Sequence, residues 1–193
     1  MVLKNPRVQR ILDLIDLFGV AGITHIHKLE YSKSKYGLQD ARRKMLDLCK
    51  EGALKRKRSD YNGKYYYWLA SQKPFGQPQH RLVLLDFYVM LCRKYGRGNI
   101  EIHVEYTGIP GIRPDAYIKI RNVKMLFVEI HLSNNDINLE KYIPAAKKEP
   151  FGEGIFPYIV VISDRKVTVS REVNEAVTVI TDGLKMSKLE GII

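Results

Sequence analysis

The 193-residue sequence predicts an α+β protein with two domains, residues 1–73 and residues 74–193. Two observations predict this class. The first domain shows helical spacing of apolar residues and then a hairpin signal, whereas the second alternates strand-like and helical segments. The composition, 45% hydrophobic and 27% charged, is ordinary for a chain that buries a core.

The first two helices are predicted from apolar residues that recur every three or four positions. Residues 8–18 form the first such run, and Gly19 and Gly22 are expected to end that helix. Residues 23–31 form the second, with Thr24 as its expected N-cap because a threonine oxygen can accept a hydrogen bond from the first turn.

A third helix is predicted over residues 38–54, after a polar break at residues 32–37. At 100° per residue, apolar and polar positions of this segment separate onto opposite faces. The face expected in the core holds Leu38, Ala41, Met45, Leu48 and Gly52. The opposite face holds Tyr36, Gln39, Arg43, Asp47 and Lys50.

A basic hairpin follows, with two strands on either side of a tight turn at Asn62 and Gly63. The aromatic run at residues 65–68 alternates faces, so half of it is expected in the core rather than in a base-stacking surface. Three helices followed by a basic hairpin is the order of a winged helix-turn-helix, whose third helix enters the major groove of DNA.

The sequence predicts which side chains of this domain contact double-stranded DNA. Gln39 can pair with adenine and Arg43 with guanine, while hydroxyl and cationic groups of the turn and the wing hold phosphates. The predicted DNA-binding residues are Ser34, Lys35, Tyr36, Gln39, Arg42 and Arg43, with Arg56, Arg58 and Lys64 of the wing. A winged helix that contacts only protein is the alternative.

The distribution of charge supports a polyanionic partner. Residues 1–73 contain 16 Lys or Arg and 7 Asp or Glu, whereas residues 74–193 contain 16 and 14. A basic domain that neutralises phosphates releases counterions, which favours DNA binding. A membrane-surface segment is disfavoured because the charges lie on a turn and a hairpin rather than on an amphipathic helix. Without an apolar run or a signal-peptide core, we expect a cytoplasmic protein with no membrane partner.

The second domain is predicted to start with a linker at residues 71–79 that is rich in proline and glycine. The order expected after it is helix, three strands, helix, strand, helix and strand. The segments are residues 80–96, 100–107, 115–120, 124–132, 135–149 (helical until Pro144 interrupts it), 157–164, 171–176 and 177–181. This order matches the core of restriction-endonuclease-like folds.

Two carboxylates of this domain, Asp115 and Glu129, lie where metal-dependent nucleases of that fold hold Mg²⁺. Those enzymes also use a lysine two residues after the second carboxylate, where this sequence has His131. A neutral imidazole does not provide a fixed positive charge. The alternative is structural: Asp115 as a turn cap, and Glu129 with His131 as a satisfied polar pair, for instance with Arg113. We expect a non-catalytic domain without cofactor, and Mg²⁺ only if the domain is a nuclease.

Cys49 and Cys92 fall within apolar helical patterns, so both are expected to be buried free thiols. No Cys/His spacing typical of a zinc site occurs in the sequence.

From about Arg10 to about Asp182, the chain resembles the replication-relaxation family of bacterial plasmid and phage proteins. The resemblance is carried, in order, by ARRKMLDLCKEGAL, the His80-led HRLVLLDFYVML, PDAYIKI and FVEIH. In that family the last motif usually reads Glu-x-Asp, and His131 departs from it here. The resemblance implies a DNA-binding protein of a mobile element, linked to replication, copy control or transfer.

The sequence therefore predicts a regulator of transcription or replication that prefers certain DNA sequences. A homodimer is expected, because two winged helices double the base contacts across a two-fold site. The alternative is a metal-dependent DNA nuclease or nickase that uses Asp115 and Glu129, with His131 beside them.

Overall fold

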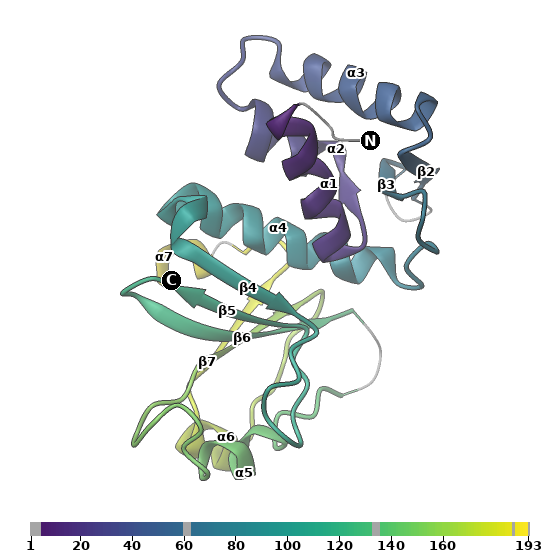
Figure 1. The fold of residues 1–193 in the computed structure, drawn as a ribbon. Helices are drawn as coiled ribbons and strands as arrows, with labels where there is room; N and C mark the ends of the chain where they lie inside the picture. Colours follow the sequence, from purple (N-terminus) through teal and green to yellow (C-terminus); the bar gives the residue numbers. More distant parts are fainter. Residues whose placement is uncertain (1–4, 60–62, 133–135, 187, 193) are drawn as a thin grey trace. The chain divides into compact units, whose positions relative to one another are not determined.

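The computed structural model describes residues 5–59, 63–132, 136–186 and 188–192. The chain has mixed α+β structure, as the sequence predicts, and divides into two compact units, Met1–Val89 and Met90–Ile193 (Figure 1). The division falls inside a helix, later than the predicted boundary between residues 73 and 74. Among the described residues, no helix has both the length and the apolar character needed to cross a lipid bilayer.

The first predicted helix is confirmed as α1, Pro6–Phe18. The Asn5 side chain accepts a hydrogen bond from Arg7 N at 3.0 Å, and proline opens the first turn, where a missing N–H costs nothing. Gly19 ends the helix in the left-handed region, with φ 73°, which glycine adopts without strain.

The second predicted helix is a short α-helix, α2 (Ile23–Ile26), that continues into a π-helical segment, His27–Tyr31. Thr24 is not its N-cap. Gly22 is the N-cap instead, and its N–H donates to Nδ1 of His25 in the first turn at 2.9 Å, so the bond runs in the opposite direction from the one expected of a threonine cap.

The third helix, α3, spans Gly37–Lys50 and buries one face. Ala41, Met45 and Leu48 of the predicted core face are buried, but Leu38 is half-buried and Gly52, beyond the helix, is exposed. Gly37 is buried at the first position because the helix starts directly against the carbonyl of Tyr31.

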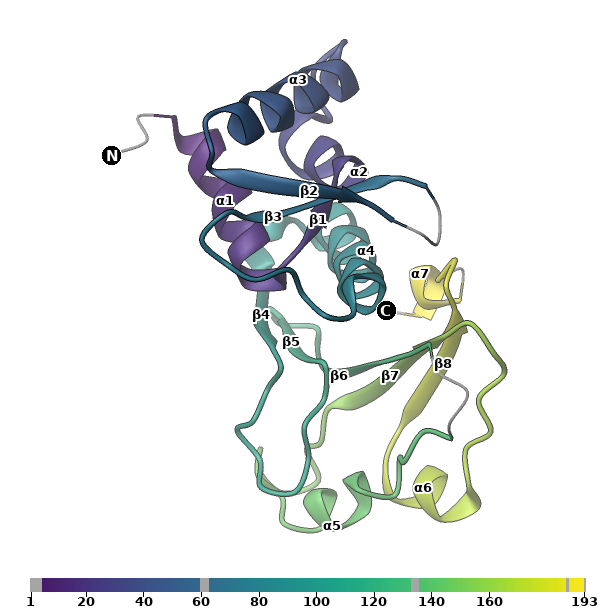
Figure 2. The ribbon, with the colours of Figure 1, turned by 90° about the vertical axis from the view of Figure 1, so that its right-hand side faces the viewer.

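The predicted hairpin consists of β2, Leu54–Arg58, and β3, Tyr65–Leu69, which pair antiparallel. The two-residue strand β1, Ala21–Gly22, pairs on the other side of β3, so the sheet order is β1-β3-β2 (Figure 2). The tip that includes the predicted turn residue Asn62 lies outside the described residues.

The aromatic run is more buried than the alternation predicts. Tyr66, Tyr67 and Trp68 are all buried, and only Tyr65 is exposed. Tyr66 and Trp68 pack on Val20 and Leu82. Strand β3 is also the central strand of the sheet, with a partner strand on each edge.

The linker leads into α4, Pro78–Tyr95, and contributes to the core of the N-terminal unit. Phe75 packs against the cluster around Tyr66 and Trp68, and the guanidinium of Arg81 lies 4.4 Å from the centre of its ring. Cys92 in α4 is buried as predicted, but Cys49 is only half-buried, and partial burial raises the pKa of its thiol.

The C-terminal unit contains a five-stranded sheet in the order β4-β5-β6-β7-β8. The first two pairings, β4 with β5 and β5 with β6, are antiparallel, and the last two are parallel. The strands are β4 Ile100–Val104, β5 Ala116–Ile120, β6 Lys124–His131, β7 Tyr158–Ser163 and β8 Val179–Gly183. Each was predicted, and the apolar β7 is buried almost throughout.

One helix of this unit differs from its prediction. The segment before Pro144 was expected to be helical, but α5 spans only Tyr142–Ala146, with Pro144 inside it. Proline fits the first turn of a helix because the N–H groups of that turn have no intrahelical acceptor, so no hydrogen bond is lost. The helix α6, Arg171–Ala176, was predicted and is capped by Ser170, whereas α7, Leu189–Ile192, was not predicted.

An aromatic cluster forms the core on one face of this sheet. Tyr117 of β5 and Phe127 of β6 pack with Tyr142 of α5 and with Val173 of α6. Phe127 and Tyr142 are stacked, with ring centres 5.7 Å apart. This packing fixes α5 against β6, and it positions the polar residues described next.

Candidate functional site

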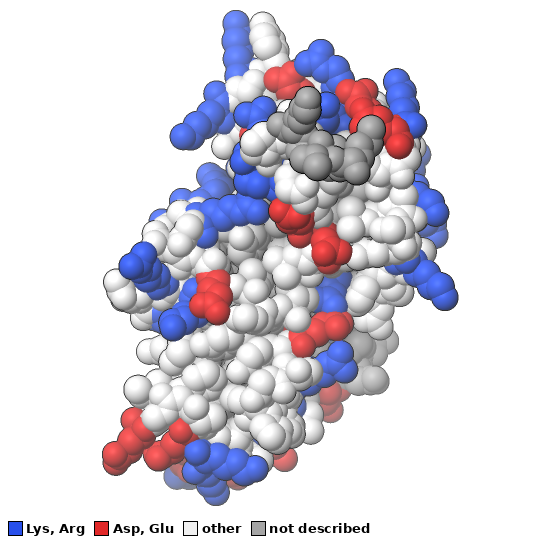
Figure 3. Space-filling model, in the orientation of Figure 1, with Lys and Arg blue, Asp and Glu red and all other residues white. Residues whose placement is uncertain are grey.

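All nine predicted DNA-contact residues are exposed in the structure. They lie on three neighbouring parts of the N-terminal unit: the turn before α3, the outer face of α3, and the hairpin β2–β3. Figure 3 shows lysine and arginine side chains projecting from the surface where α3 lies. The structure thus brings these groups to the surface of one unit, opposite the buried residues Ala41, Met45 and Leu48.

Asp40, which the sequence analysis did not single out, connects two of the nine residues. Its Oδ1 accepts a hydrogen bond from Nη2 of Arg43 at 2.8 Å, and its Oδ2 accepts one from the Ser34 hydroxyl at 3.0 Å. The spacing of three residues on one helix could have revealed the pair with Arg43. The tie to Ser34 depends on the turn and has no sequence signal.

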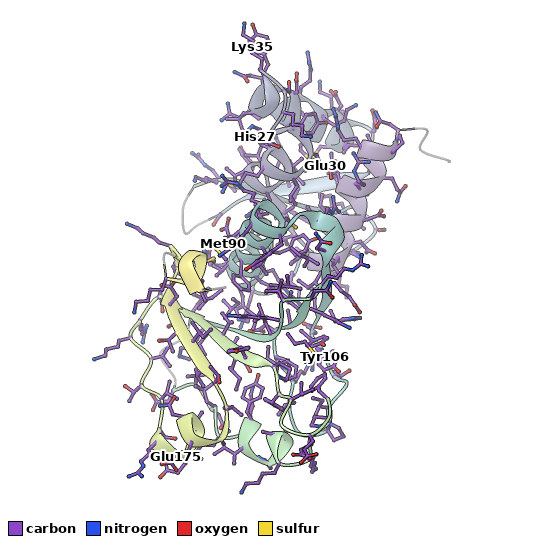
Figure 4. All side chains as sticks on the ribbon, turned by 90° about the vertical axis from the view of Figure 1, so that its left-hand side faces the viewer. His27, Glu30, Lys35, Met90, Tyr106 and Glu175 are labelled. Atoms are coloured by element: carbon purple, nitrogen blue, oxygen red, sulfur yellow. The ribbon has the colours of Figure 1, made fainter. Side chains whose placement is uncertain are left out.

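The other residues of this face are less constrained. The side chains of Gln39 and Arg42 are exposed and bond to no residue in the described part of the chain. Lys35 lies at the turn before α3 and points outward (Figure 4), with its ammonium 5.4 Å from the ring centre of Tyr36. Tyr36 is 58% exposed, which makes it the most exposed large aromatic side chain among the described residues.

Contacts within the hairpin orient its two predicted DNA-contact arginines. The guanidinium of Arg56 lies 4.6 Å from the ring centre of Tyr65, and Nε of Arg58 donates to the carbonyl of Gly63 at 2.7 Å. Arg56 also bonds to the hydroxyl of Tyr67, although burial outweighs this contact and raises the pKa of that hydroxyl. Both cations therefore stay on the outer surface of the hairpin with restricted orientations.

The structure brings together the two carboxylates predicted in the C-terminal unit. Asp115 precedes β5, where its N–H donates to the carbonyl of Val128 at 2.9 Å. Its Oδ2 accepts from the N–H of Ile130 at 2.7 Å, so Asp115 bonds to β6 on either side of Glu129, once through its backbone and once through its carboxylate. The carboxylate bond joins Asp115 to the neighbouring strand rather than to a turn.

Glu129 lies in the middle of β6 and is only 8% exposed. Its Oε1 accepts a hydrogen bond from the hydroxyl of Tyr142 at 2.5 Å and pairs with the ammonium of Lys141 at 2.6 Å. Burial is the largest influence and raises the pKa of Glu129, and the nearby charge of Asp115 raises it further. Lys141 and Tyr142 act in the opposite direction by stabilising the carboxylate.

These contacts correct two sequence-based expectations. Arg113 does not pair with Glu129, because its Nη2 lies 3.3 Å from Oε2 of Glu105. His131 is half-buried and its side chain bonds to no described residue, so it is not part of a satisfied pair with Glu129. The positive charge beside Glu129 comes from Lys141, which precedes α5 and lies ten residues after His131 in the sequence.

The fit of this site to Mg²⁺ is partial. Oε1 of Glu129 is occupied by Tyr142 and Lys141, whereas Oε2 has no partner among the described residues and could bind a metal ion together with Asp115. Two carboxylates suit Mg²⁺, which keeps several of its waters. The described part of the chain contains no cluster of three or more histidine, cysteine, aspartate or glutamate side chains placed to hold a metal.

No family model matches this chain, and the comparison with curated proteins found no match. Among solved structures, protein VC1899 from Vibrio cholerae is similar, with a TM-score of 0.36 and 15% sequence identity. The alignment covers 97% of this chain and 55% of VC1899, so the chain spans about half the length of that protein.

Proposed function

We propose that the N-terminal unit is a winged helix-turn-helix domain that binds double-stranded DNA. The element order α1, β1, α2, α3, β2 and β3 supports this proposal, with α3 as the recognition helix and the hairpin as the wing. The second half of the chain is proposed to have a nuclease-like fold. The net positive charge of the first 73 residues adds an electrostatic reason for a polyanionic partner.

The observation that carries the proposal is the division of α3 into two faces. Its inner face is apolar and buried, and its outer face presents Gln39, Arg42 and Arg43. In the proposed complex Gln39 and Arg43 contact base edges, while Arg42 and the wing cations contact phosphates. Tyr36 and Ser34 add contacts from the turn before the helix.

The regulatory role follows from the resemblance to replication-relaxation proteins of plasmids and phages. We propose that the protein regulates transcription or replication of a mobile element and binds DNA as a homodimer. Selection from a random duplex library tests both parts. A palindromic site with half-sites about 10 base pairs apart supports the dimer, since one helical turn places two recognition helices on the same side. Binding with no enriched sequence would contradict the regulator.

The first prediction concerns Arg43. Arg43→Ala should lower affinity by roughly 1–3 kcal/mol for the selected site and flatten the preference at one base position. The measurement is fluorescence anisotropy on the selected duplex and on its single-base variants. Arg42→Ala is the matched control, because loss of a phosphate contact should weaken binding evenly over all sequences. An unchanged preference in Arg43→Ala would remove this residue from base reading.

The second prediction concerns the wing. If Arg56 and Arg58 each neutralise a phosphate, the double variant with alanine at both positions should reduce the slope of log affinity against log salt by about 2. The control replaces Lys147 and Lys148, two exposed lysines of the C-terminal unit, and should leave the slope unchanged. Equal slopes for the parent and the wing variant would exclude phosphate contacts by the wing.

A second candidate function is metal-dependent cleavage of DNA by Asp115 and Glu129. The observation in its favour is Lys141, whose ammonium lies 2.6 Å from Glu129 and offers the positive charge that His131 does not. Such enzymes use the metal to activate water and to stabilise charge on the phosphate. Here the two carboxylates would hold Mg²⁺, and Lys141 would orient the nucleophilic water.

The third prediction tests this activity with supercoiled plasmid DNA and Mg²⁺ or Mn²⁺. Under the cleavage hypothesis, the parent protein nicks the plasmid, whereas Asp115→Ala, purified in the same way, does not. Asp136→Ala is the control, because this exposed aspartate lies outside the pair and its loss should not affect nicking. Nicking that persists in Asp115→Ala would come from another source, and no nicking by the parent would leave DNA binding as the function.

A further inference from the structure

We propose that Asp40 is a positioning residue that holds Arg43 in the orientation required to read a guanine. This inference rests on the proposed DNA binding and adds a determinant of sequence specificity to it. Asp40 lies in the first turn of α3, one helical turn before Arg43, and bonds to it through Oδ1 at 2.8 Å. An arginine reads guanine by two parallel hydrogen bonds to O6 and N7, which requires a defined guanidinium plane.

The geometry leaves Arg43 accessible while Asp40 is partly shielded. The side chain of Arg43 is 76% exposed and that of Asp40 is 31% exposed. Only Nη2 of Arg43 bonds within the described part of the chain, so donors on the rest of the guanidinium remain for a base. The aspartate itself is anchored, because its Oδ2 accepts from the Ser34 hydroxyl at 3.0 Å.

The charge of Asp40 argues against a simple role in affinity. A carboxylate on the outer part of a DNA-binding helix repels phosphates and weakens nonspecific binding. A free arginine side chain, in contrast, samples many rotamers and binds phosphates as readily as bases. A carboxylate that fixes one rotamer of Arg43 therefore lowers nonspecific affinity for DNA and increases discrimination between bases.

A structural role for Asp40 is the competing explanation. A negative charge in the first turn interacts favourably with the helix dipole, and the hydrogen bond from Ser34 connects the preceding turn to α3. Both effects contribute to stability, but neither gives a reason for a change in preference at one base pair. Sequence preference therefore separates the two explanations.

The experiment measures affinity for the selected duplex and for all its single-base variants. The proteins are the parent, Arg43→Ala, Asp40→Ala, Asp40→Asn, Asp47→Ala and the double variant with alanine at positions 40 and 43, each first shown to be folded by its thermal transition. Asp47→Ala is the matched control, since it removes the same charge from α3 at a residue that does not bond to Arg43 in the structure. The base pair read by Arg43 is the one at which Arg43→Ala loses its preference.

Asp40→Ala is expected to reduce discrimination at that base pair by about 2- to 5-fold, the range for an exposed ion pair, with Asp40→Asn in between. Affinity for unrelated DNA should rise in both Asp40→Ala and Asp47→Ala, while Asp47→Ala keeps the parental preference. In Arg43→Ala, additional loss of Asp40 should change discrimination no further. A parental preference in both Asp40 variants overturns the inference and leaves the DNA-binding proposal intact. A parent without any base preference overturns both.

Discussion

Gly37→Ala is expected to destabilise the N-terminal unit by about 3 kcal/mol, the upper end for an overpacked site. A Cβ atom at this position would lie 2.1 Å from the carbonyl oxygen of Tyr31 and 3.1 Å from the ring of His27. The oxygen belongs to the backbone of the π-helical segment, so it cannot move away by a change of rotamer as a side-chain atom can. To admit alanine, α3 must move away from Tyr31, and its outer face moves with it.

The measurement is urea unfolding followed by the fluorescence of Trp68, the only tryptophan of the chain, which is buried in this unit. Gly76→Ala is the control, because a Cβ there meets no atom within 4 Å and the backbone does not require glycine. We also expect Gly37→Ala to lose DNA affinity at temperatures where it remains folded. Equal unfolding midpoints for the two variants would show that the start of α3 adjusts without cost.

Lys141→Met is expected to destabilise the protein by about 3–5 kcal/mol at neutral pH, as when one partner of a buried ion pair is removed. Glu129 would keep the hydrogen bond from Tyr142 but would lose its only opposite charge among the described residues. Methionine retains most of the aliphatic volume of lysine, so the cost arises from the uncompensated carboxylate rather than from a cavity.

The loss should depend on pH in a defined direction. Burial already raises the pKa of Glu129 above the value of 4.5 for an unperturbed glutamate, and Lys141 lowers it. Without Lys141 the pKa rises further, so the folded variant binds a proton that the unfolded chain releases. Stability of the variant is therefore retained below about pH 4.5 and decreases as pH rises through the raised pKa of Glu129.

Urea unfolding monitored by circular dichroism between pH 4 and pH 8 would measure this dependence. The control is Lys147→Met, which removes an exposed lysine six residues further along the chain. The difference between Lys141→Met and the parent should be smallest at pH 4 and largest at pH 8, and Lys147→Met should follow the parent. A difference that does not change with pH would mean that Glu129 is neutral in the parent.

The sequence by itself determined most of the elements. Periodicity located α1, α3 and the strands of both sheets, because burial of one face repeats every 3.6 residues in a helix and every two in a strand. It also identified the exposed face of α3. These features depend on neighbours in the chain, which a sequence displays directly.

Only the tertiary structure decided which polar groups meet. Lys141 pairs with Glu129 because Tyr142 and Phe127 pack together and fix the start of α5 against β6. The sequence predicted a helix over residues 135–149 but contains no local signal that Lys141 would lie beside Glu129. Likewise, the Ser34 hydroxyl reaches Asp40 only after the turn closes on Gly37. Such contacts depend on packing between segments, and no local pattern of residues encodes them.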